Sequence, residues 1–232
     1  MRFRVVGCSP AWPNPGGCHS GYLLEADSVR ILLDCGPGVL ARLRAEEGWP
    51  RVDAIVISHF HLDHCGDLVP WLWGCLMGGA PPAPALHIPP GSRADLDALA
   101  SRFGEAFEVH EYDGPFDVGG FHVTPHRVAH LTQPTWGLRV EWNGVTFAYS
   151  ADTGPTDALL EIARDADLFV CEATLSEPED EPRGHLTHDE AAEVAQRAGA
   201  KRLLLTHRPV ELAAPGFELA RDGLQLDLSR SA

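Results

Sequence analysis

The sequence predicts a mixed α and β fold that contains a large amount of β-sheet. Short apolar runs with a period of two recur from the first residues onward, and amphipathic segments with a helical period separate the later runs. Polar clusters repeatedly follow the predicted strands, at the end of a strand where open α/β architectures hold ligands. The chain has 232 residues, of which 44% are hydrophobic and 22% are charged, as expected for a globular protein with a substantial core.

The first half of the chain is predicted to consist mainly of strands. Alternating apolar residues over 1–8 indicate a strand, and the segment 22–36 indicates two strands joined by a polar turn at 26–28. Pro37 is placed to open an amphipathic helix over 39–49. The next expected elements are a buried strand, a helix, a proline-rich loop around a brief strand, and a helix with Ser92 as its N-cap, over residues 52–58, 67–77, 78–92 and 92–104.

In the second half, strands come first and helices then alternate with strands. Alternating or apolar runs predict strands over 107–113, 121–130, 136–142 and 145–150. Asn143-Gly144, between the last two runs, is a strong signal for a two-residue hairpin turn. Two helix–strand pairs follow, over 156–166 with 167–173 and over 187–199 with 202–207, and the C-terminal segment is expected to add a last strand.

Charge and hydropathy exclude several classes of protein. The chain has 18 basic against 33 acidic residues, a net charge of −15 with neutral histidines, and Lys201 is its single lysine. Nucleic-acid binding depends on cation contacts with phosphates, so a nucleic-acid partner is not expected. The chain contains no apolar run long enough to cross a membrane, and the alternating first residues do not resemble a signal peptide. We therefore expect a cytoplasmic protein without a membrane partner.

Six cysteines stand at positions 8, 18, 35, 65, 75 and 171, and none forms a CxxC pair. With a cytosolic start, this pattern favours reduced and mostly buried thiols over a disulfide framework or a thiolate zinc site. Cys65 is of interest because it directly follows the histidine-rich motif.

The segment Ser58–His64 concentrates groups that bind metal ions. His59 and His61 stand two residues apart at the end of a predicted strand, so their side chains point to the same side. Asp63 and His64 follow where the chain must turn. Imidazole and carboxylate suit Zn²⁺, Mn²⁺ or Fe²⁺. Four such groups within six residues are more easily divided between two ions than placed around one.

Three further polar residues, His130, Asp152 and His207, each close an apolar strand. An aspartate has two oxygens and so can bridge two metals. The expected division places His59, His61 and His130 on one ion, Asp63, His64 and His207 on the other, and Asp152 between them. Two such ions about 3.5–4 Å apart convert a bridging water to a hydroxide near neutral pH. Ordinary surface or core histidines are the alternative, but this clustering argues against it.

His59-x-His61-x-Asp63-His64 resembles the HxHxDH motif of the metallo-β-lactamase superfamily. LLDCG at 32–36 resembles the strand that precedes this motif, and SADTG at 150–154 resembles the segment with the bridging aspartate. The resemblance implies the α+β class, as a four-layer αββα sandwich, with one hydrolase domain over 1–232. It also implies the same seven ligands, His59, His61, Asp63, His64, His130, Asp152 and His207. His130 has a competitor in His126, four residues earlier.

A second motif narrows the resemblance to the ribonuclease Z-like phosphodiesterases. Cys171-Glu172-Ala173-Thr174, followed by Gly184-His185-Leu186-Thr187 before a predicted helix, resembles their EAT…GHxT segment. In that group the histidine faces the scissile phosphate, which implies that His185 assists the leaving oxygen and that Asp63 orients the hydroxide. The alternatives are that His185 only caps a helix, or that His188 has this role. His188 is better suited to the chemistry of a helix N-terminus.

The expected substrate is a small phosphodiester. Ribonuclease Z carries an arm that grips tRNA between the positions of His130 and Asp152, but here only 21 residues, a compact hairpin, separate the two. Several segments of the chain resemble a short bacterial branch that includes cyclic-nucleotide phosphodiesterases. The resemblance therefore implies hydrolysis of 3′,5′-cyclic AMP or another cyclic nucleotide, with two divalent ions, zinc first and manganese or iron as alternatives. The sequence does not give the oligomeric state, although relatives are often homodimers.

Other activities and other contacts stay open at this point. A ribonuclease Z-type endonuclease, or a lactonase or thioesterase of the same superfamily, are the competing functions, and a metal-binding module without activity is a further one. Trp12, Trp71 and Trp73 could stack on a base, but tryptophans on a helix beside a sheet are more often core or dimer contacts. Asp34 and Glu172 are expected either to orient ligand imidazoles or to be buried structural acids.

Overall fold

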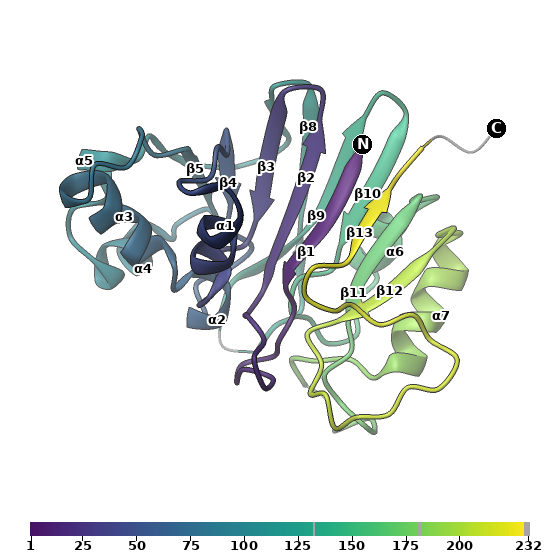
Figure 1. The fold of residues 1–232 in the computed structure, drawn as a ribbon. Helices are drawn as coiled ribbons and strands as arrows, with labels where there is room; N and C mark the ends of the chain where they lie inside the picture. The colour runs from purple at the N-terminus through teal and green to yellow at the C-terminus, as the bar shows by residue number, and fades with distance from the viewer. Residues whose placement is uncertain (132, 181, 230–232) are drawn as a thin grey trace.

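Two β-sheets face each other in the computed structural model, which describes residues 1–131, 133–180 and 182–229 (Figure 1). One group of helices covers the outer face of the first sheet, and a second group covers the outer face of the second sheet. The layers therefore run helix, sheet, sheet, helix, as the predicted αββα sandwich requires. No helix in the described ranges is long and apolar enough to span a bilayer.

The first sheet runs in the order β13-β1-β2-β3-β4-β5-β6. Its strands are β1 (Arg2–Gly7), β2 (Gly21–Ala26), β3 (Val29–Leu33), β4 (Ala54–Val56), β5 (Ala85–Ile88), β6 (Val109–Glu111) and β13 (Gln225–Asp227). The strands from β3 to β6 pair in parallel, so their carboxyl ends lie at one edge of the sheet. The expected last strand is β13, which pairs with β1.

The second sheet runs in the order β12-β11-β10-β9-β8-β7. Its strands are β7 (Phe116–Val118), β8 (Phe121–Val128), β9 (Thr135–Trp142), β10 (Val145–Tyr149), β11 (Leu168–Glu172) and β12 (Leu203–Thr206). The predicted hairpin joins β9 to β10, and Asn143 and Gly144 both have the positive φ that its turn requires, 47° and 78°. The strands β10, β11 and β12 pair in parallel.

The helices divide between the two outer faces. Those that pack with the first sheet are α1 (Val39–Glu47), α2 (Leu62–Cys65), α3 (Leu68–Met77), α4 (Arg93–Leu99) and α5 (Phe103–Ala106). Those that pack with the second sheet are α6 (Ala158–Ala163) and α7 (His188–Ala198).

Side chains of one strand alternate between two cores, because successive residues of a strand point to opposite faces. In β3, Ile31 and Leu33 lie in the core between the sheets, whereas Leu32 faces the helices. In β11, Val170 lies between the sheets and Cys171 faces α6 and α7. Both faces of each sheet are covered, which explains why the central strands read as nearly continuous apolar runs.

The structure differs from the expected elements at a few places. The helix expected over 92–104 is broken into α4 and α5, because Ala100 is extended and turns the chain so that Phe103 reaches the core. Ser92 stands at the N-cap of α4, but its side chain makes no capping hydrogen bond. The short strand β7 and the one-turn helix α2 were not expected, since three or four residues are too few to show a period.

Candidate metal centre and active site

The structure brings the seven predicted ligands together at the carboxyl ends of the strands. His59 and His61 follow β4, and Asp63 and His64 lie in α2. The other three follow strands of the second sheet: His130 comes after β8, Asp152 after β10, and His207 after β12. The cluster therefore lies where one edge of each sheet meets the other, and residues from both sheets are needed to build it.

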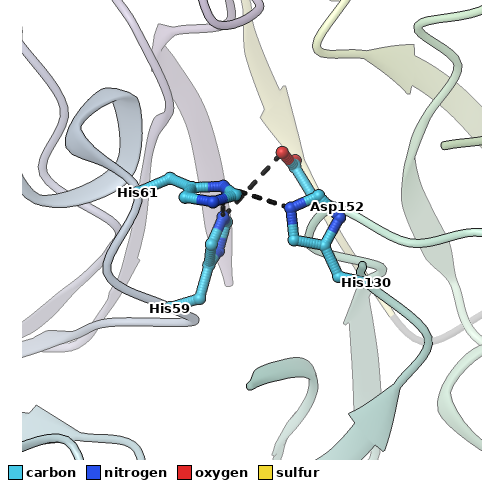
Figure 2. A group of neighbouring side chains, drawn as sticks. All are labelled: His59, His61, His130 and Asp152. Carbon is cyan, nitrogen blue, oxygen red and sulfur yellow. Dashed lines mark hydrogen bonds and ion pairs between the residues drawn. The ribbon is translucent and has the colours of Figure 1, made fainter. Parts of the chain in front are cut away.

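His59, His61, His130 and Asp152 form a first group, which Figure 2 shows. Nδ1 of His61 lies 3.1 Å from Nε2 of His59 and 3.1 Å from Nε2 of His130. Nε2 of His59 lies 3.9 Å from Oδ2 of Asp152. Metal–nitrogen bonds of about 2.0–2.1 Å place neighbouring ligand atoms roughly 3 Å apart, so these three nitrogens have the spacing of ligands around one ion.

Asp63, His64, Asp152 and His207 form a second group. Oδ2 of Asp63 lies 3.0 Å from Nε2 of His207 and 3.4 Å from Nε2 of His64. The two oxygens of Asp152 face different partners, since Oδ1 lies 3.3 Å from Nε2 of His64 and Oδ2 lies 3.5 Å from Nε2 of His207. Asp152 thus belongs to both groups, in the bridging place expected of it.

The donors of this cluster fit two divalent metal ions. Nε2 of His64 and Oδ1 of Asp152 are fully buried, and neither atom makes a hydrogen bond in the described structure. Buried polar atoms normally have a partner, because leaving one unsatisfied costs about 1–3 kcal/mol. A metal ion held by His64 and Asp152 would remove that cost.

The ionisation of most of the ligands also suits a metal, with the exception of His64, whose pKa is held well above its usual value because the carboxylates of Asp152, Asp34 and Asp63 outweigh burial. Burial lowers the pKa of His59 well below its usual value and lowers the pKa of His61 and His130, so these imidazoles are neutral. Burial by itself would raise the pKa of Asp63 and of Asp152, but the imidazoles of His64 and His207 outweigh it and lower the pKa of both carboxyls. Neutral imidazoles and charged carboxylates are the forms that bind metals.

Asp34 holds His64 from behind. Its carboxylate is fully buried, and Oδ2 accepts hydrogen bonds from Nδ1 of His64 at 2.8 Å, from Oγ of Ser58 at 2.9 Å and from the hydroxyl of Tyr149 at 2.8 Å. Oδ1 accepts from the backbone N–H of Ser58 at 2.8 Å. A donated Nδ1–H leaves Nε2 of His64 as the atom that faces the cluster. Of the two roles expected for Asp34, the structure supports the orientation of an imidazole.

Two other ligand imidazoles are oriented by contacts on the nitrogen that points away from the cluster. Nδ1 of His130 donates to the carbonyl of Gly184 at 2.9 Å. Nδ1 of His207 lies 3.0 Å from Oγ1 of Thr174. The partners come from the segments around Glu172 and His185, so the same two segments support the ligands and carry the second motif.

The backbone is strained at three positions of the centre. Asp34, Ala151 and His207 have φ of 60°, 53° and 54°, a region that residues other than glycine rarely adopt. Asp34 forms a hydrogen bond with a residue of the cluster, Ala151 directly precedes Asp152, and His207 belongs to the cluster itself. Such strain costs of order 1–3 kcal/mol per residue and persists where the surrounding structure imposes it.

His185 lies beside the metal cluster and is paired with a buried acid. Its Nδ1 donates to Oε1 of Glu172 at 2.9 Å, and its ring stacks on His207 with centroids 5.8 Å apart. Burial by itself would lower the pKa of His185, but the hydrogen bond and charge of Glu172 raise it to about 9. Because Nδ1 is committed to Glu172, Nε2 is the nitrogen that can reach a substrate.

The loop that carries His185 is anchored to the start of α7. Thr187 is the N-cap of this helix and forms a capping box with Glu190. Glu190 also accepts hydrogen bonds from the buried guanidinium of Arg183. His185 is therefore not the residue that caps the helix, which is the alternative role considered for it.

The competing residues lie elsewhere. His126 lies within β8 and belongs to none of the groups of ligands, because the chain leaves β8 at Val128 and only His130 turns toward the site. His188 is the first residue of α7 and contacts Phe217. The six cysteines are free, and Sγ of Cys65 donates to the carbonyl of His61.

The three tryptophans differ in exposure. Trp71 is buried in the core on the inner side of α3, so it is a core residue and does not stack on a substrate. Trp12 and Trp73 are exposed.

Two supporting residues were missed by the sequence reasoning. Tyr149 reaches Asp34 from the opposite sheet, and Gly184 contributes only its carbonyl to His130. An apolar strand pattern contains no signal for the first contact, and a glycine contains none for the second. The GHxT resemblance had marked Gly184 only as the neighbour of His185.

Comparison with known proteins agrees with this geometry. A family model described as a β-lactamase superfamily domain matches residues 29–208. The chain belongs to the β-lactamase superfamily. It is 37% identical over 223 residues to an uncharacterised protein from Mycobacterium tuberculosis, and the match covers 90% of this chain and 81% of the relative.

Two relatives of the superfamily domain have informative names. A probable metallo-hydrolase from Bacillus subtilis, YhfI, is 30% identical over 217 residues, with 90% of this chain and 87% of YhfI covered. The crystal structure of YhfI superposes with a TM-score of 0.87, at 24% identity, over 97% of this chain and 98% of that one. A ribonuclease Z from Mycobacterium bovis is 30% identical over 254 residues, with 94% and 89% covered. The protein is a metal-dependent hydrolase with a ribonuclease Z-like fold.

Proposed function

We propose that this superfamily member is a phosphodiesterase that uses two divalent metal ions and hydrolyses a small phosphodiester, with 3′,5′-cyclic AMP or another cyclic nucleotide as the best candidate. Zinc is the first choice of metal, and manganese or iron would suit the same ligands. The proposal assigns His59, His61 and His130 to one ion, Asp63, His64 and His207 to the other, and Asp152 to both.

The hydrogen bond between Glu172 and His185 carries this proposal. It places an imidazole with a fixed Nδ1–H beside the metal cluster without adding it to either group of metal ligands. An imidazole in that place can donate to a phosphate oxygen or protonate a leaving alkoxide. Hydrolysis of a lactone or thioester does not need a donor there, so the pair favours a phosphodiester over those substrates.

In the proposed reaction the metal cluster and His185 have different roles. Two divalent ions, when bound, would activate a water as the nucleophile and neutralise the charge of the phosphate. We assign the orientation of that water to Asp63, whose carboxylate lies within 3.4 Å of Nε2 of both His64 and His207 in the second group. Nε2 of His185 then donates a proton to the leaving oxygen, while Glu172 keeps the ring in place and stabilises its positive charge.

The segment between His130 and Asp152 supports a small substrate. It contains the end of the loop after β8 and the strands β9 and β10, whose turn is the tight hairpin at Asn143-Gly144. These strands belong to the second sheet and leave no residues for an arm that could hold a tRNA. Ribonuclease Z activity is the second candidate, because a ribonuclease Z is 30% identical to this chain.

The test is the hydrolysis of bis(p-nitrophenyl) phosphate by metal-loaded protein, run with cyclic AMP, a lactone and precursor tRNA as further substrates. We expect turnover of the diester and of cyclic AMP. His185→Ala should lower kcat for the diester by about 10²–10⁴-fold while the metal content, measured by atomic emission, stays at the wild-type value.

A matched control is His188→Ala, which removes a neighbouring histidine outside the cluster and should keep wild-type activity. Turnover of the lactone without turnover of any diester, with two metals bound, would overturn the proposal. Cleavage of precursor tRNA in preference to cyclic AMP would show instead that the protein acts as a ribonuclease.

A further inference from the structure

Asn14 links the loop between β1 and β2 to the segment that leaves the metal centre. Its Nδ2 donates to the carbonyl of Arg208 at 2.9 Å, and its Oδ1 accepts from the N–H of Val210 at 3.0 Å. Pro209, between these two residues, has no N–H to donate. One amide side chain therefore spans the two residues that flank Pro209, directly after the ligand His207.

The loop between β1 and β2 holds Asn14 in a fixed place. Its sequence Asn14-Pro15-Gly16-Gly17 has proline and glycine at the two central positions of a turn, and the N–H of Gly17 donates to the carbonyl of Asn14 at 2.8 Å. Gly16 has a φ of 71°, as a type II turn requires at that position. The N–H of Asn14 donates to Oγ of the buried Ser9 at 3.1 Å. The backbone around Asn14 is therefore constrained before its side chain meets the second segment.

His207 needs support on the side that Asn14 holds. Its φ of 54° lies in a region that residues other than glycine rarely adopt. On the N-terminal side, the pairing of β12 with β11 holds the chain up to Thr206, whose carbonyl accepts from the N–H of Ala173 at 3.1 Å. On the C-terminal side, the two backbone groups that Asn14 binds have no backbone partner among the described residues.

Thr174 does not hold His207 alone. Its Oγ1 lies 2.9 Å from the carbonyl of His207, 3.0 Å from Nδ1 of the same residue and 2.9 Å from Oε2 of Glu172. A hydroxyl has one hydrogen to donate, so the carbonyl and the carboxylate compete for it. The strained backbone of His207 therefore depends also on the contacts that follow it in the chain.

We propose that Asn14 is a positioning residue that keeps His207 in its strained conformation and so sets the place of its imidazole in the second group of ligands. This inference rests on the two-ion centre of the proposed function. Without the two hydrogen bonds, the backbone after β12 can relax toward negative φ, which moves Nε2 of His207 away from Oδ2 of Asp63, now 3.0 Å distant. The first group contains no residue of this segment and should keep its geometry.

The test is the stepwise removal of Co²⁺ from cobalt-loaded protein by a chelator, followed by visible absorption. Two affinities are expected for the wild type, and His207→Ala and His130→Ala identify them because each variant removes a ligand of one group. Asn14→Leu keeps the approximate volume but forms neither hydrogen bond. We expect it to weaken the ion that His207→Ala weakens by about tenfold and the other ion by less than about twofold. The absorption bands of the weakened ion should also change, because they report ligand geometry.

Two further variants separate a positioning role from a general loss of stability. Asn14→Ala also removes both hydrogen bonds, and it should weaken the same ion to a similar extent. Gln196→Ala removes an exposed amide from α7 and should keep both wild-type affinities. Arg208 still ties the segment to the carbonyls of Ala173 and Leu212, so we expect both Asn14 variants to fold.

The outcomes separate this inference from the proposed function. Wild-type affinities and absorption in both Asn14 variants would overturn the positioning role and leave the two-ion centre intact. An equal loss at both ions would assign the effect to general destabilisation and would also overturn that role. Binding of a single ion by the wild type would instead overturn the two-ion centre on which the inference rests.

Discussion

Nδ1 of His64 donates a hydrogen bond of 2.8 Å to Oδ2 of Asp34, although the two residues are 30 positions apart in the chain. Asp34 directly follows β3 and His64 lies in α2, so the bond links the carboxyl end of one strand to the motif that follows the next. Among the described residues, Nε2 of His64 has no hydrogen-bond partner, and it faces the carboxylates of Asp63 and Asp152. The bond therefore fixes the tautomer and the direction of an imidazole that the cluster needs.

Asp34→Asn tests this relationship. Asparagine tolerates the positive φ of this position but has one acceptor oxygen and no charge, so the four hydrogen bonds to Asp34 cannot all form and His64 loses the carboxylate that holds it. We expect metal affinity to fall about 10–100-fold, measured by competition with a chromophoric chelator. Tyr149→Phe removes only one donor to the same carboxylate and should cost clearly less. Equal metal affinity in Asp34→Asn and the wild type would contradict the role given to Asp34.

Metal removal should lower thermal stability. A ligand present at 100 times its Kd adds about 2.7 kcal/mol per site, and each kcal/mol is worth roughly 2–4 °C in a domain of this size. Two saturated sites should therefore raise Tm by roughly 10–20 °C over chelated protein, as measured by differential scanning calorimetry. Asp152→Ala should lose most of this increase because Asp152 joins both groups, whereas Asp97→Ala on α4 should keep it.

Glu172→Gln separates the orientation of His185 from metal binding. Glu172 accepts hydrogen bonds from His185, from the N–H of Thr153 and from Thr174, and it lies outside the two main groups of ligands. Glutamine keeps the shape but loses the charge that stabilises a protonated His185. We expect kcat for bis(p-nitrophenyl) phosphate to fall about 10²-fold at unchanged metal content. Loss of metal in this variant would show instead that Glu172 supports the cluster.

Gly184→Ala should disturb His130. A Cβ at this position would lie 2.9 Å from Nδ1 of His130, closer than side chains pack, and would also crowd its hydrogen bond to the carbonyl of Gly184. We expect metal affinity to fall by at least tenfold, measured by chelator competition. Gly114→Ala is the control, since a Cβ there meets no atom within 4 Å. Wild-type affinity in Gly184→Ala would mean that this loop moves away at little cost.

His87 should make the protein less stable in mild acid. It stacks on Phe116 with ring centroids 4.4 Å apart, and burial together with the charge of His110 lowers its pKa from 6.5 to about 4. The folded protein then binds fewer protons than the unfolded chain, so the unfolding free energy falls as pH decreases from about 6.5 to about 4. His87 is only half-buried, so solvent screening limits the loss to on the order of 1–2 kcal/mol.

His87→Phe keeps the stacking surface and removes the titration. Urea unfolding should therefore show that the wild type loses more stability between pH 7.5 and pH 4.5 than the variant, by on the order of 1–2 kcal/mol. At pH 7.5 the two proteins should be close in stability. Parallel curves across this range would assign the acid sensitivity to other groups.

Much of the fold was predictable because strand periodicity and turn chemistry are local properties. The Asn143-Gly144 hairpin and the alternation of Ile31, Leu32 and Leu33 follow from positive φ and from the two faces of a strand. The break between α4 and α5 was not predictable, because Ala100 extends only to bring Phe103 into a core that distant segments complete.

The sequence by itself determined the chemistry of the centre. His59, His61, Asp63 and His64 stand within six consecutive residues, and this spacing indicates a metal-binding motif because few other arrangements would gather these groups. Only the tertiary structure decided that His130 and not His126 joins it, and that Tyr149 supports Asp34 from the opposite sheet. The physical reason is that sequence spacing determines which neighbouring side chains lie close together, whereas the packing of the two sheets determines which distant side chains reach the same site.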